Sequence, residues 1–251
     1  MKKRTFRFRL AAWLSELIAP VESRCLNCGR EVFDGLGFCP ECKKEVNFNN
    51  VKTCKRCGVG LDGAEDYCGY CAFEKVYFDR AFSVLEYDGA VRAAILRFKF
   101  DGCGNFARIF AKYLAFAVQH QGVEFDVVTY APMTNKAKRK RGYNQAQLLA
   151  NYFCDILGCE EKSANAIEKI KETEPQEKLG KEERKSNLVG AYRCVADVKG
   201  KRVLVIDDIK TTGATLNECA KVLKRAGAVN VVGLTVASRR EKFLYEVDNE
   251  G

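Results

Sequence analysis

The sequence predicts an α/β fold with a parallel sheet, preceded by a small cysteine-rich domain. Two apolar runs rich in β-branched residues, at 203–206 and within 125–132, are typical of strands buried on both faces of a sheet. Each run is followed by a segment whose apolar residues recur at helical spacing. The third observation is a cluster of eight cysteines between residues 25 and 71, which marks off the N-terminal part of the chain.

Composition limits the classes of protein to consider. A chain of 251 residues can form one domain with a sizeable core and a small appendage. Its formal charge of +9 suits anionic ligands. His120 is the only histidine, which excludes His-based catalytic triads and multi-histidine metal sites. No apolar run is long enough to span a bilayer, and the many paired cysteines favour a reducing, cytoplasmic location.

The N-terminus combines basic residues with a short apolar stretch. A signal peptide is disfavoured because Glu16 interrupts the stretch and because export would expose the cysteines to oxidation. We instead expect an amphipathic helix within residues 1–24 that docks on the rest of the protein. A helix lying on a membrane surface is the alternative. The apolar face of the helix comprises Leu10, Trp13, Leu14, Leu17 and Ile18.

Residues 25–75 contain an internal repeat of CxxC pairs. In each repeat ten residues separate the two pairs, and glycine follows the first pair, at Gly29 and Gly58. Four thiolates satisfy tetrahedral Zn²⁺ and leave no open position, so two structural zinc sites are predicted. A segment this small cannot bury enough apolar area to fold alone, and zinc supplies about 10 kcal/mol per site. The predicted ligands are Cys25, Cys28, Cys39, Cys42, Cys54, Cys57, Cys68 and Cys71.

Two alternatives to this double zinc ribbon remain open. The cysteines could form two disulfides, or one CxxC pair could be a redox centre. Ligation within each repeat is favoured over interleaved ligation. Scaffolding and nucleic-acid contact are both open as roles for the ribbons.

The most informative stretch is VLVIDDIKTTGAT, residues 203–215. Its strand leads into Asp207 and Asp208, then into a Thr/Gly turn and a helix, whose N-terminus favours phosphate. Gly213 lets a ligand approach the backbone closely. Two carboxylates would repel a bare phosphate, so the ligand must also carry hydroxyls, as a phosphorylated sugar does. An ordinary strand–turn–helix corner with surface aspartates is the alternative.

Residues 76–251 are predicted to form one domain around this stretch. Residues 81–87 alternate like a strand, and helices are expected from residue 90 and over 104–119. The basic run 136–141 is a charged surface in the plainest interpretation. Asn144 and Gln147 have N-cap and N3 spacing, so Asn144 either caps a helix starting at Gln145 or contacts a ligand.

These motifs carry a family resemblance. The stretch 203–215 resembles the phosphoribosyl pyrophosphate (PRPP) motif of type I phosphoribosyltransferases. The cysteine repeat, the FKF segment 98–100, RGYNQ at 141–145 and this motif occur in an order similar to the ComF family. Its members are competence-associated, phosphoribosyltransferase-like proteins with an N-terminal zinc ribbon. Gln176, Leu179, Arg184 and residues 187–192 also match the family's spacing, whereas Tyr143 replaces its usual Phe and 130–133 is less apolar.

The resemblance implies a type I phosphoribosyltransferase-like sheet and assigns roles to residues. Asp207 and Asp208 would be catalytic and hold the ribose hydroxyls. The charged stretch 160–187 would partly form a lid over the site. PRPP would be bound by these two acids with Lys210, Thr211, Thr212, Gly213, Ala214 and Thr215. Pyrophosphate or the lid would involve Lys99, Arg141, Asn144, Gln145 and Arg184.

The implied reaction is Mg²⁺-assisted displacement of pyrophosphate from PRPP by an acceptor that the sequence does not identify. The resemblance links the protein to DNA uptake, with PRPP, single-stranded DNA or DNA-uptake proteins as partners and a homodimer as a candidate assembly. The alternative is a PRPP sensor without catalysis, which would hold DNA or a protein through the ribbons and the basic run.

Overall fold

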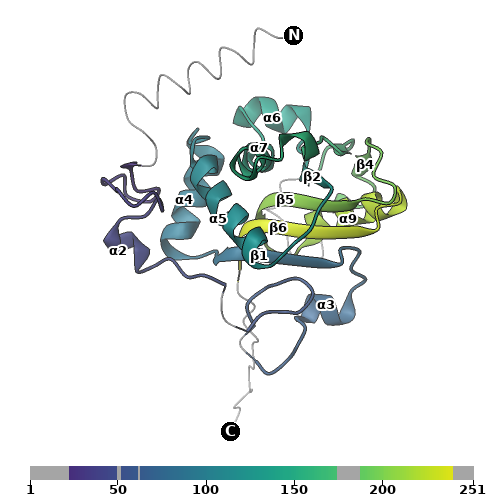
Figure 1. The fold of residues 1–251 in the computed structure, drawn as a ribbon, viewed down its shortest axis with the longest axis horizontal. Helices are drawn as coiled ribbons and strands as arrows, with labels where there is room; N and C mark the ends of the chain where they lie inside the picture. Colours follow the sequence, from purple (N-terminus) through teal and green to yellow (C-terminus); the bar gives the residue numbers. More distant parts are fainter. Residues whose placement is uncertain (1–22, 50–51, 62, 174–186, 240–251) are drawn as a thin grey trace.

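A computed structural model describes residues 23–49, 52–61, 63–173 and 187–239 (Figure 1). The predicted N-terminal helix and Arg184 lie outside these ranges. The core is a four-stranded parallel sheet in the order β1-β6-β5-β2, which confirms the predicted class of fold. The strands are β1 Arg80–Glu86, β2 Val127–Tyr130, β5 Arg202–Lys210 and β6 Asn230–Ser238.

Strand β5 lies inside the sheet and is buried on both faces. Val203 and Val205 pack into one apolar cluster, whereas Leu204 and Ile206 pack into the other. This alternation follows from the two-residue period of a strand. It explains why the run has no polar residue until Asp207.

The sheet is covered by helices on both faces (Figure 1). Helices α4 Gly89–Phe100, α5 Phe106–His120 and α7 Gln145–Leu157 share the cluster of Leu204. Helix α9 Ala214–Arg225 packs on the opposite face, together with the hairpin of β3 Ile167–Lys169 and β4 Tyr192–Cys194. Two further short helices are α6 Asn135–Arg141 and η2 Glu160–Lys162.

The two cysteine repeats lie on opposite sides of strand β1. The first repeat contains α2 Pro40–Lys43 and packs into the cluster of α4 and α5. The second contains α3 Gly69–Phe73 and packs into the cluster of α9. In Figure 1, α2 lies beside α4, and α3 lies below β1.

The segment between the repeats covers the edge of the sheet. Phe48 pairs with Leu85 in an antiparallel bridge, and the Asn49 amide donates to the Val84 carbonyl at 2.9 Å. From the second repeat, the Arg56 carbonyl accepts from the Ala81 amide at 2.8 Å. This segment and the second repeat therefore satisfy backbone groups that an edge strand would otherwise expose.

The basic run has more structure than a solvated loop. Residues 135–141 form α6, and the Thr134 side chain caps the helix by accepting from the Ala137 amide at 3.2 Å. The side chains of 135–140 are all exposed. Across the described ranges, none of the helices combines the length and apolar character needed to cross a bilayer.

Candidate functional site

The candidate site lies where the lengths of neighbouring strands differ. Strand β2 ends at Tyr130, opposite Ile206, whereas β5 continues to Lys210. On its other side β5 stays paired with β6, with Asp207 opposite Thr235 and Lys210 opposite Ser238. The sequence suggested that the two acids follow the strand. In the structure they lie within it, because β6 extends alongside them. They are at the carboxyl edge, where open parallel sheets bind ligands.

The two acids point to opposite faces of the sheet. Asp208 forms an ion pair with Lys99 of α4, with 3.3 Å between Nζ and Oδ1, and both side chains are largely buried. Asp207 faces α9 and β4, where its charge acts on Cys219 and Tyr192. Burial, followed by the charge of Asp208, raises the pKa of Asp207 to about 7. The pair therefore gains from a ligand that offers hydroxyl donors or a cation.

The Thr/Gly turn connects the acids to α9. Gly213 has φ 78°, a left-handed conformation that side chains disfavour, and α9 begins at the next residue. The Ala214 amide donates to Thr212 Oγ1 at 3.3 Å. Thr211, Thr212 and Thr215 are partly exposed. A helix N-terminus with short hydroxyl side chains is suited to a phosphate group.

The side chain of Lys210 contacts the second cysteine repeat. Lys210 is only 4% exposed, and its Nζ lies 3.5 Å from Cys57 Sγ. The family resemblance grouped Lys210 with the phosphate-binding residues of the turn. A buried ammonium needs an anionic or hydrogen-bonding partner, which the cysteine cluster supplies.

The RGYNQ segment attaches α7 to the end of α4. Tyr143 Oη donates to the Phe98 carbonyl, and Gln145 Nε2 donates to the carbonyls of Phe98 and Lys99 at 3.4 and 3.5 Å. Arg141 lies 5.0 Å from the ring centre of Phe100 and donates to Gln145 Oε1 at 3.3 Å. These contacts hold the end of α4, and with it Lys99, beside the acid pair.

Asn144 caps α7. Its Oδ1 accepts from the amides of Ala146 and Gln147 at 3.0 and 3.4 Å, and its Nδ2 donates to the Ala131 carbonyl at 3.0 Å. The capping alternative is therefore confirmed, and α7 begins at Gln145 as predicted. The cap also fixes the chain just after β2, at the border of the site.

Tyr192 is a residue of the site that the sequence did not identify. Burial raises its pKa well above the usual value, while a hydrogen bond with Thr215 acts in the opposite direction. In the sequence, Tyr192 only matched the spacing of the ComF family. No local pattern shows that a tyrosine in this hairpin lies near Asp207. Of the predicted lid, residues 174–186 lie outside the described ranges. Its preceding part forms η2 and β3, with Ala166 and Ile167 buried.

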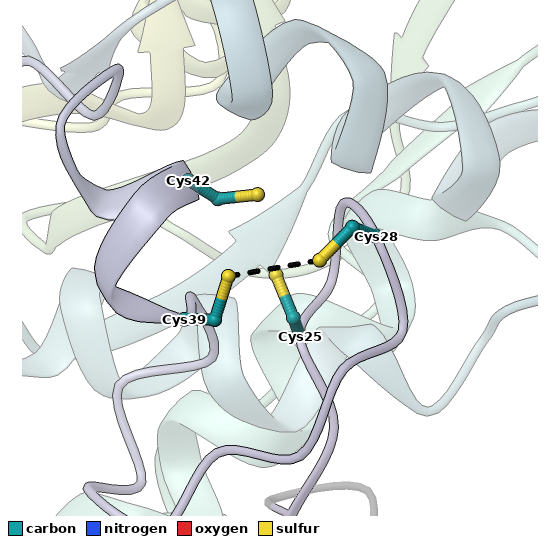
Figure 2. A group of neighbouring side chains, drawn as sticks. All are labelled: Cys25, Cys28, Cys39 and Cys42. Atoms are coloured by element: carbon teal, nitrogen blue, oxygen red, sulfur yellow. Dashed lines mark hydrogen bonds between the residues drawn. The ribbon is translucent and has the colours of Figure 1, made fainter.

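The eight paired cysteines form two separate clusters. Cys25, Cys28, Cys39 and Cys42 have all their sulfurs within 4.8 Å of one another, and Figure 2 shows them turned toward a common centre. The second repeat forms the same kind of cluster from Cys54, Cys57, Cys68 and Cys71. Ligand sets are thus sequential and not interleaved. All 13 cysteines lie in the described ranges and are free, so the disulfide alternative is not supported.

The geometry of both clusters fits Zn²⁺. The sulfurs of Cys28 and Cys39 are 3.6 Å apart, and those of Cys57 and Cys68 are 3.5 Å apart. Tetrahedral Zn–S bonds of about 2.3 Å place sulfurs about 3.8 Å from one another. Four sulfur ligands leave no position for a substrate, so these zinc sites are structural.

Comparison with known families agrees with this architecture. The model of the double zinc ribbon domain matches residues 14–72, and that of the phosphoribosyl transferase domain matches residues 139–249. Competence protein F of Haemophilus influenzae is 29% identical over 225 residues, covering 85% of this chain and 97% of that protein. Competence protein ComFC of Bacillus subtilis is 27% identical, covering 88% and 86%. DNA utilization protein YhgH of Escherichia coli K12 is 28% identical, covering 78% and 87%.

Solved structures match about half of the chain. Phosphoribosylpyrophosphate synthetase from Mycobacterium smegmatis is 21% identical with a TM-score of 0.33, covering 51% of this chain and 33% of that one. Purine phosphoribosyltransferase from Pyrococcus horikoshii is 17% identical with a TM-score of 0.34, covering 55% and 86%.

The sheet, the acid pair and the family matches define a protein with a phosphoribosyltransferase-type domain behind a double zinc ribbon. The two family models match in the order zinc ribbon and then phosphoribosyl transferase domain, which is the order of the corresponding sequence motifs. Over most of its length the chain is similar to proteins of the ComF family, which supports its placement with them.

Proposed function

We propose that the protein binds PRPP at the carboxyl edge of β5 and transfers its phosphoribosyl group to an acceptor. The observation that carries this proposal is the acid pair in β5, followed within five residues by the Gly213 turn into α9. Carboxylates suit ribose hydroxyls, and the helix N-terminus suits the 5′-phosphate. Neither feature alone requires a sugar phosphate, whereas their juxtaposition matches both ends of one ligand.

The proposed roles follow from this placement. Asp207 and Asp208 accept hydrogen bonds from the ribose hydroxyls, and their charge tolerates the positive charge that develops on the ring. The 5′-phosphate is held by the backbone amides of the turn and by the hydroxyls of Thr211, Thr212 and Thr215. Lys99, which pairs with Asp208, would contact the pyrophosphate.

The reaction breaks the bond between C1 and pyrophosphate, and the electron pair leaves with pyrophosphate. The acceptor forms the new bond to C1 and loses its proton. Mg²⁺, when bound with PRPP, would neutralise the leaving group. Cytoplasmic location is part of the proposal, because the eight cysteines must stay reduced to hold zinc.

Calorimetry with PRPP and ribose 5-phosphate tests the proposed binding site. Asp207→Asn with Asp208→Asn keeps the size of both side chains but removes the charge that accepts the hydroxyl hydrogen bonds. A charge-assisted hydrogen bond contributes roughly 1.5–3 kcal/mol, so we expect a loss of about a hundredfold or more in PRPP affinity. Asp197→Asn, at an exposed position after β4, is the matched control. Normal PRPP binding by the double variant would refute the assignment.

Transferase activity needs its own measurement. Candidate nitrogen acceptors would be screened for PRPP-dependent release of pyrophosphate. We expect release with an acceptor to depend on Asp207 and Asp208. PRPP binding without release for any acceptor would favour the non-catalytic alternative.

That alternative is a PRPP-responsive factor that binds DNA or a protein partner. Two observations favour it: the exposed cations of α6, and relatives named for competence and DNA utilization. Helix α6 provides cations without a base-reading element, so any DNA binding should be mainly electrostatic.

Salt dependence tests the role of α6. Changing Lys138, Arg139 and Lys140 to Gln should weaken binding of single-stranded DNA. The slope of log K against log salt should fall by about one for each phosphate group that the protein no longer neutralises. Gln at Arg193, Lys199 and Lys201 removes equal charge elsewhere and serves as the control. An unchanged affinity and slope in the α6 variant would exclude this helix from the interface.

A further inference from the structure

The second cysteine repeat contacts both ends of the turn to which the proposed function assigns the phosphate. Lys210 precedes the turn, and its Nζ lies 3.5 Å from Cys57 Sγ. A Cβ placed on Gly213 would lie 3.9 Å from the Lys210 stem carbons, so this stem also lies against the turn. One side chain therefore spans the distance from the turn to a zinc ligand.

Asn217 makes the second connection, from the first turn of α9. Its Nδ2 donates to Tyr70 Oη at 3.2 Å and to the Lys75 carbonyl at 3.1 Å, while its Oδ1 accepts from the Tyr77 amide at 2.7 Å. Tyr70 lies between the zinc ligands Cys68 and Cys71. Asn217 is only 8% exposed, so these hydrogen bonds are shielded from water.

The chemistry of a zinc centre suits Lys210 as a partner. One Zn²⁺ and four thiolates carry a formal charge of about −2, from +2 and four charges of −1. The buried ammonium of Lys210 offsets part of that charge, and the cluster in turn spares Lys210 the cost of an unpaired buried charge. Loss of the zinc centre would remove the partner that holds Lys210 in place.

The second repeat packs closely on the sheet, which limits its movement relative to the turn. A Cβ on Gly58 would lie 2.7 Å from the Ala81 carbonyl oxygen, so the chain at Gly58 approaches β1 as closely as glycine allows. The first repeat makes different contacts. Arg97 of α4 donates to the carbonyls of Leu26 and Asn27 at 2.8 and 3.0 Å, and Tyr113 of α5 donates to the Leu36 carbonyl.

We propose that the second zinc ribbon positions the phosphate-binding turn through Lys210 and Asn217. Sugar-phosphate affinity then depends on the second of the two metal centres and not on the first. Lys210 and Asn217 act as positioning residues, since their polar groups contact the ribbon. The affinity part of this inference rests on the proposed function, whereas the positioning of the turn does not.

The test compares zinc-loaded, full-length variants by amide hydrogen exchange and ligand binding. Lys210→Met keeps an apolar stem and removes the ammonium, and Lys210→Arg retains the charge. Lys55→Met is the matched control, because exposed Lys55 lies in the same repeat but pairs with Asp66, at 2.7 Å. Zinc per molecule, exchange in peptides covering 209–217 and affinity for ribose 5-phosphate would be measured for each.

We expect Lys210→Met to increase exchange in 209–217 and to weaken ribose 5-phosphate binding about tenfold or more. Lys55→Met should change neither property, and Lys210→Arg should restore much of both. Tyr70→Phe, which removes one hydroxyl within the ribbon, should increase exchange at the start of α9. Cys28→Ser should increase exchange in the first ribbon and leave exchange in 209–217 unchanged.

Wild-type exchange over 209–217 in folded Lys210→Met and Tyr70→Phe would overturn the inference. Equal effects of Lys55→Met and Lys210→Met would also overturn it, because charge and not contact would then be the cause. If wild-type protein binds neither PRPP nor ribose 5-phosphate, the proposed function fails. The exchange measurements would still decide whether the ribbon positions the turn.

Discussion

At the residue scale, Asp207 combines burial with a neighbouring carboxyl. Both effects oppose ionisation and raise its pKa to about 7, while Lys99 acts in the opposite direction. Asp208 has a partner, because Lys99 lies 3.3 Å from it. The site therefore holds one paired carboxyl and one that is costly to ionise, and a ligand that hydrogen-bonds to Asp207 would lower that cost.

This raised pKa predicts a pH dependence of stability. The unfolded chain loses the Asp207 proton near pH 4, whereas the folded protein keeps it to about pH 7. Stability from this group is full below about pH 4 and is lost as pH rises toward 7. Asp207→Asn should lessen the decline in the free energy of unfolding between pH 4 and pH 7, measured by urea denaturation. Asp197→Asn should retain it, and an equal decline in both variants would contradict the assigned pKa.

The same carboxyl predicts proton release on binding. Ribose hydroxyls and a bound cation favour the ionised form, so PRPP should displace a proton from Asp207 near pH 6 and none near pH 8.5. Calorimetry in buffers of different ionisation enthalpy measures that release. Binding heats that are independent of buffer at pH 6 would show that Asp207 does not change its protonation.

Lys99 and Thr212 provide a contrast between the two ends of PRPP. Thr212→Val should weaken PRPP and ribose 5-phosphate alike, because both carry the 5′-phosphate. Lys99→Met should weaken PRPP more, because only PRPP carries pyrophosphate. Calorimetry with both ligands measures the difference. Equal losses in the Lys99 variant would indicate that Lys99 acts only through its ion pair with Asp208.

At the element scale, each zinc ribbon is held by its metal centre more than by its own core. Gly29 and Gly58 have positive φ, and their amides donate to the carbonyls of Cys25 and Cys54 at 2.9 and 2.8 Å. Each of these bonds closes the tight turn that brings two sulfurs together. Regular structure in the described parts of the ribbons is limited to isolated bridges and the short helices α2 and α3.

Metal analysis therefore has a definite expected result. Reduced, folded protein should contain two Zn²⁺ per molecule, since eight sulfurs form two sets of four. Cys39→Ser should reduce the content to about one zinc and destabilise the first ribbon, while the acid pair and its turn stay largely folded. Elemental analysis and hydrogen exchange would measure both effects. A content of one zinc or none in wild-type protein would contradict the assignment.

At the scale of the whole molecule, the ribbons and the sheet form one packed unit. Leu26 and Phe38 of the first ribbon are buried in the cluster of α4 and α5, and Val59 and Leu61 of the second belong to the cluster of α9. The second repeat and the segment between the repeats also contribute backbone hydrogen bonds to β1. The predicted limits at 25–75 and 76–251 stay predictions, and they describe sequence units that share their cores.

This packing predicts that the sheet domain needs the ribbons. A fragment comprising 76–251 should aggregate or unfold at a lower denaturant concentration than the full chain, because the β1 edge and both apolar clusters would be exposed. Light scattering and urea denaturation would compare the two. A monomeric fragment as stable as the full chain would contradict this view of the ribbons.

The sequence by itself determined the features that are local in the chain. The CxxC spacing identified both zinc sites, the β-branched runs identified β2 and β5, and Asn144 with Gln147 identified the start of α7. These signals are readable because each depends on residues a few positions apart. A similar apolar run at 230–238 could have identified β6, which lies between β1 and β5 and was not among the predicted strands.

The tertiary structure decided which distant residues meet. Lys99 pairs with Asp208 across more than a hundred positions, and Lys210 reaches Cys57 from the other end of the chain. The ribbons lie on opposite faces of the sheet, although their sequences repeat one pattern. Such contacts depend on strand order and helix packing, which arise when the whole core is buried, and no local spacing encodes them.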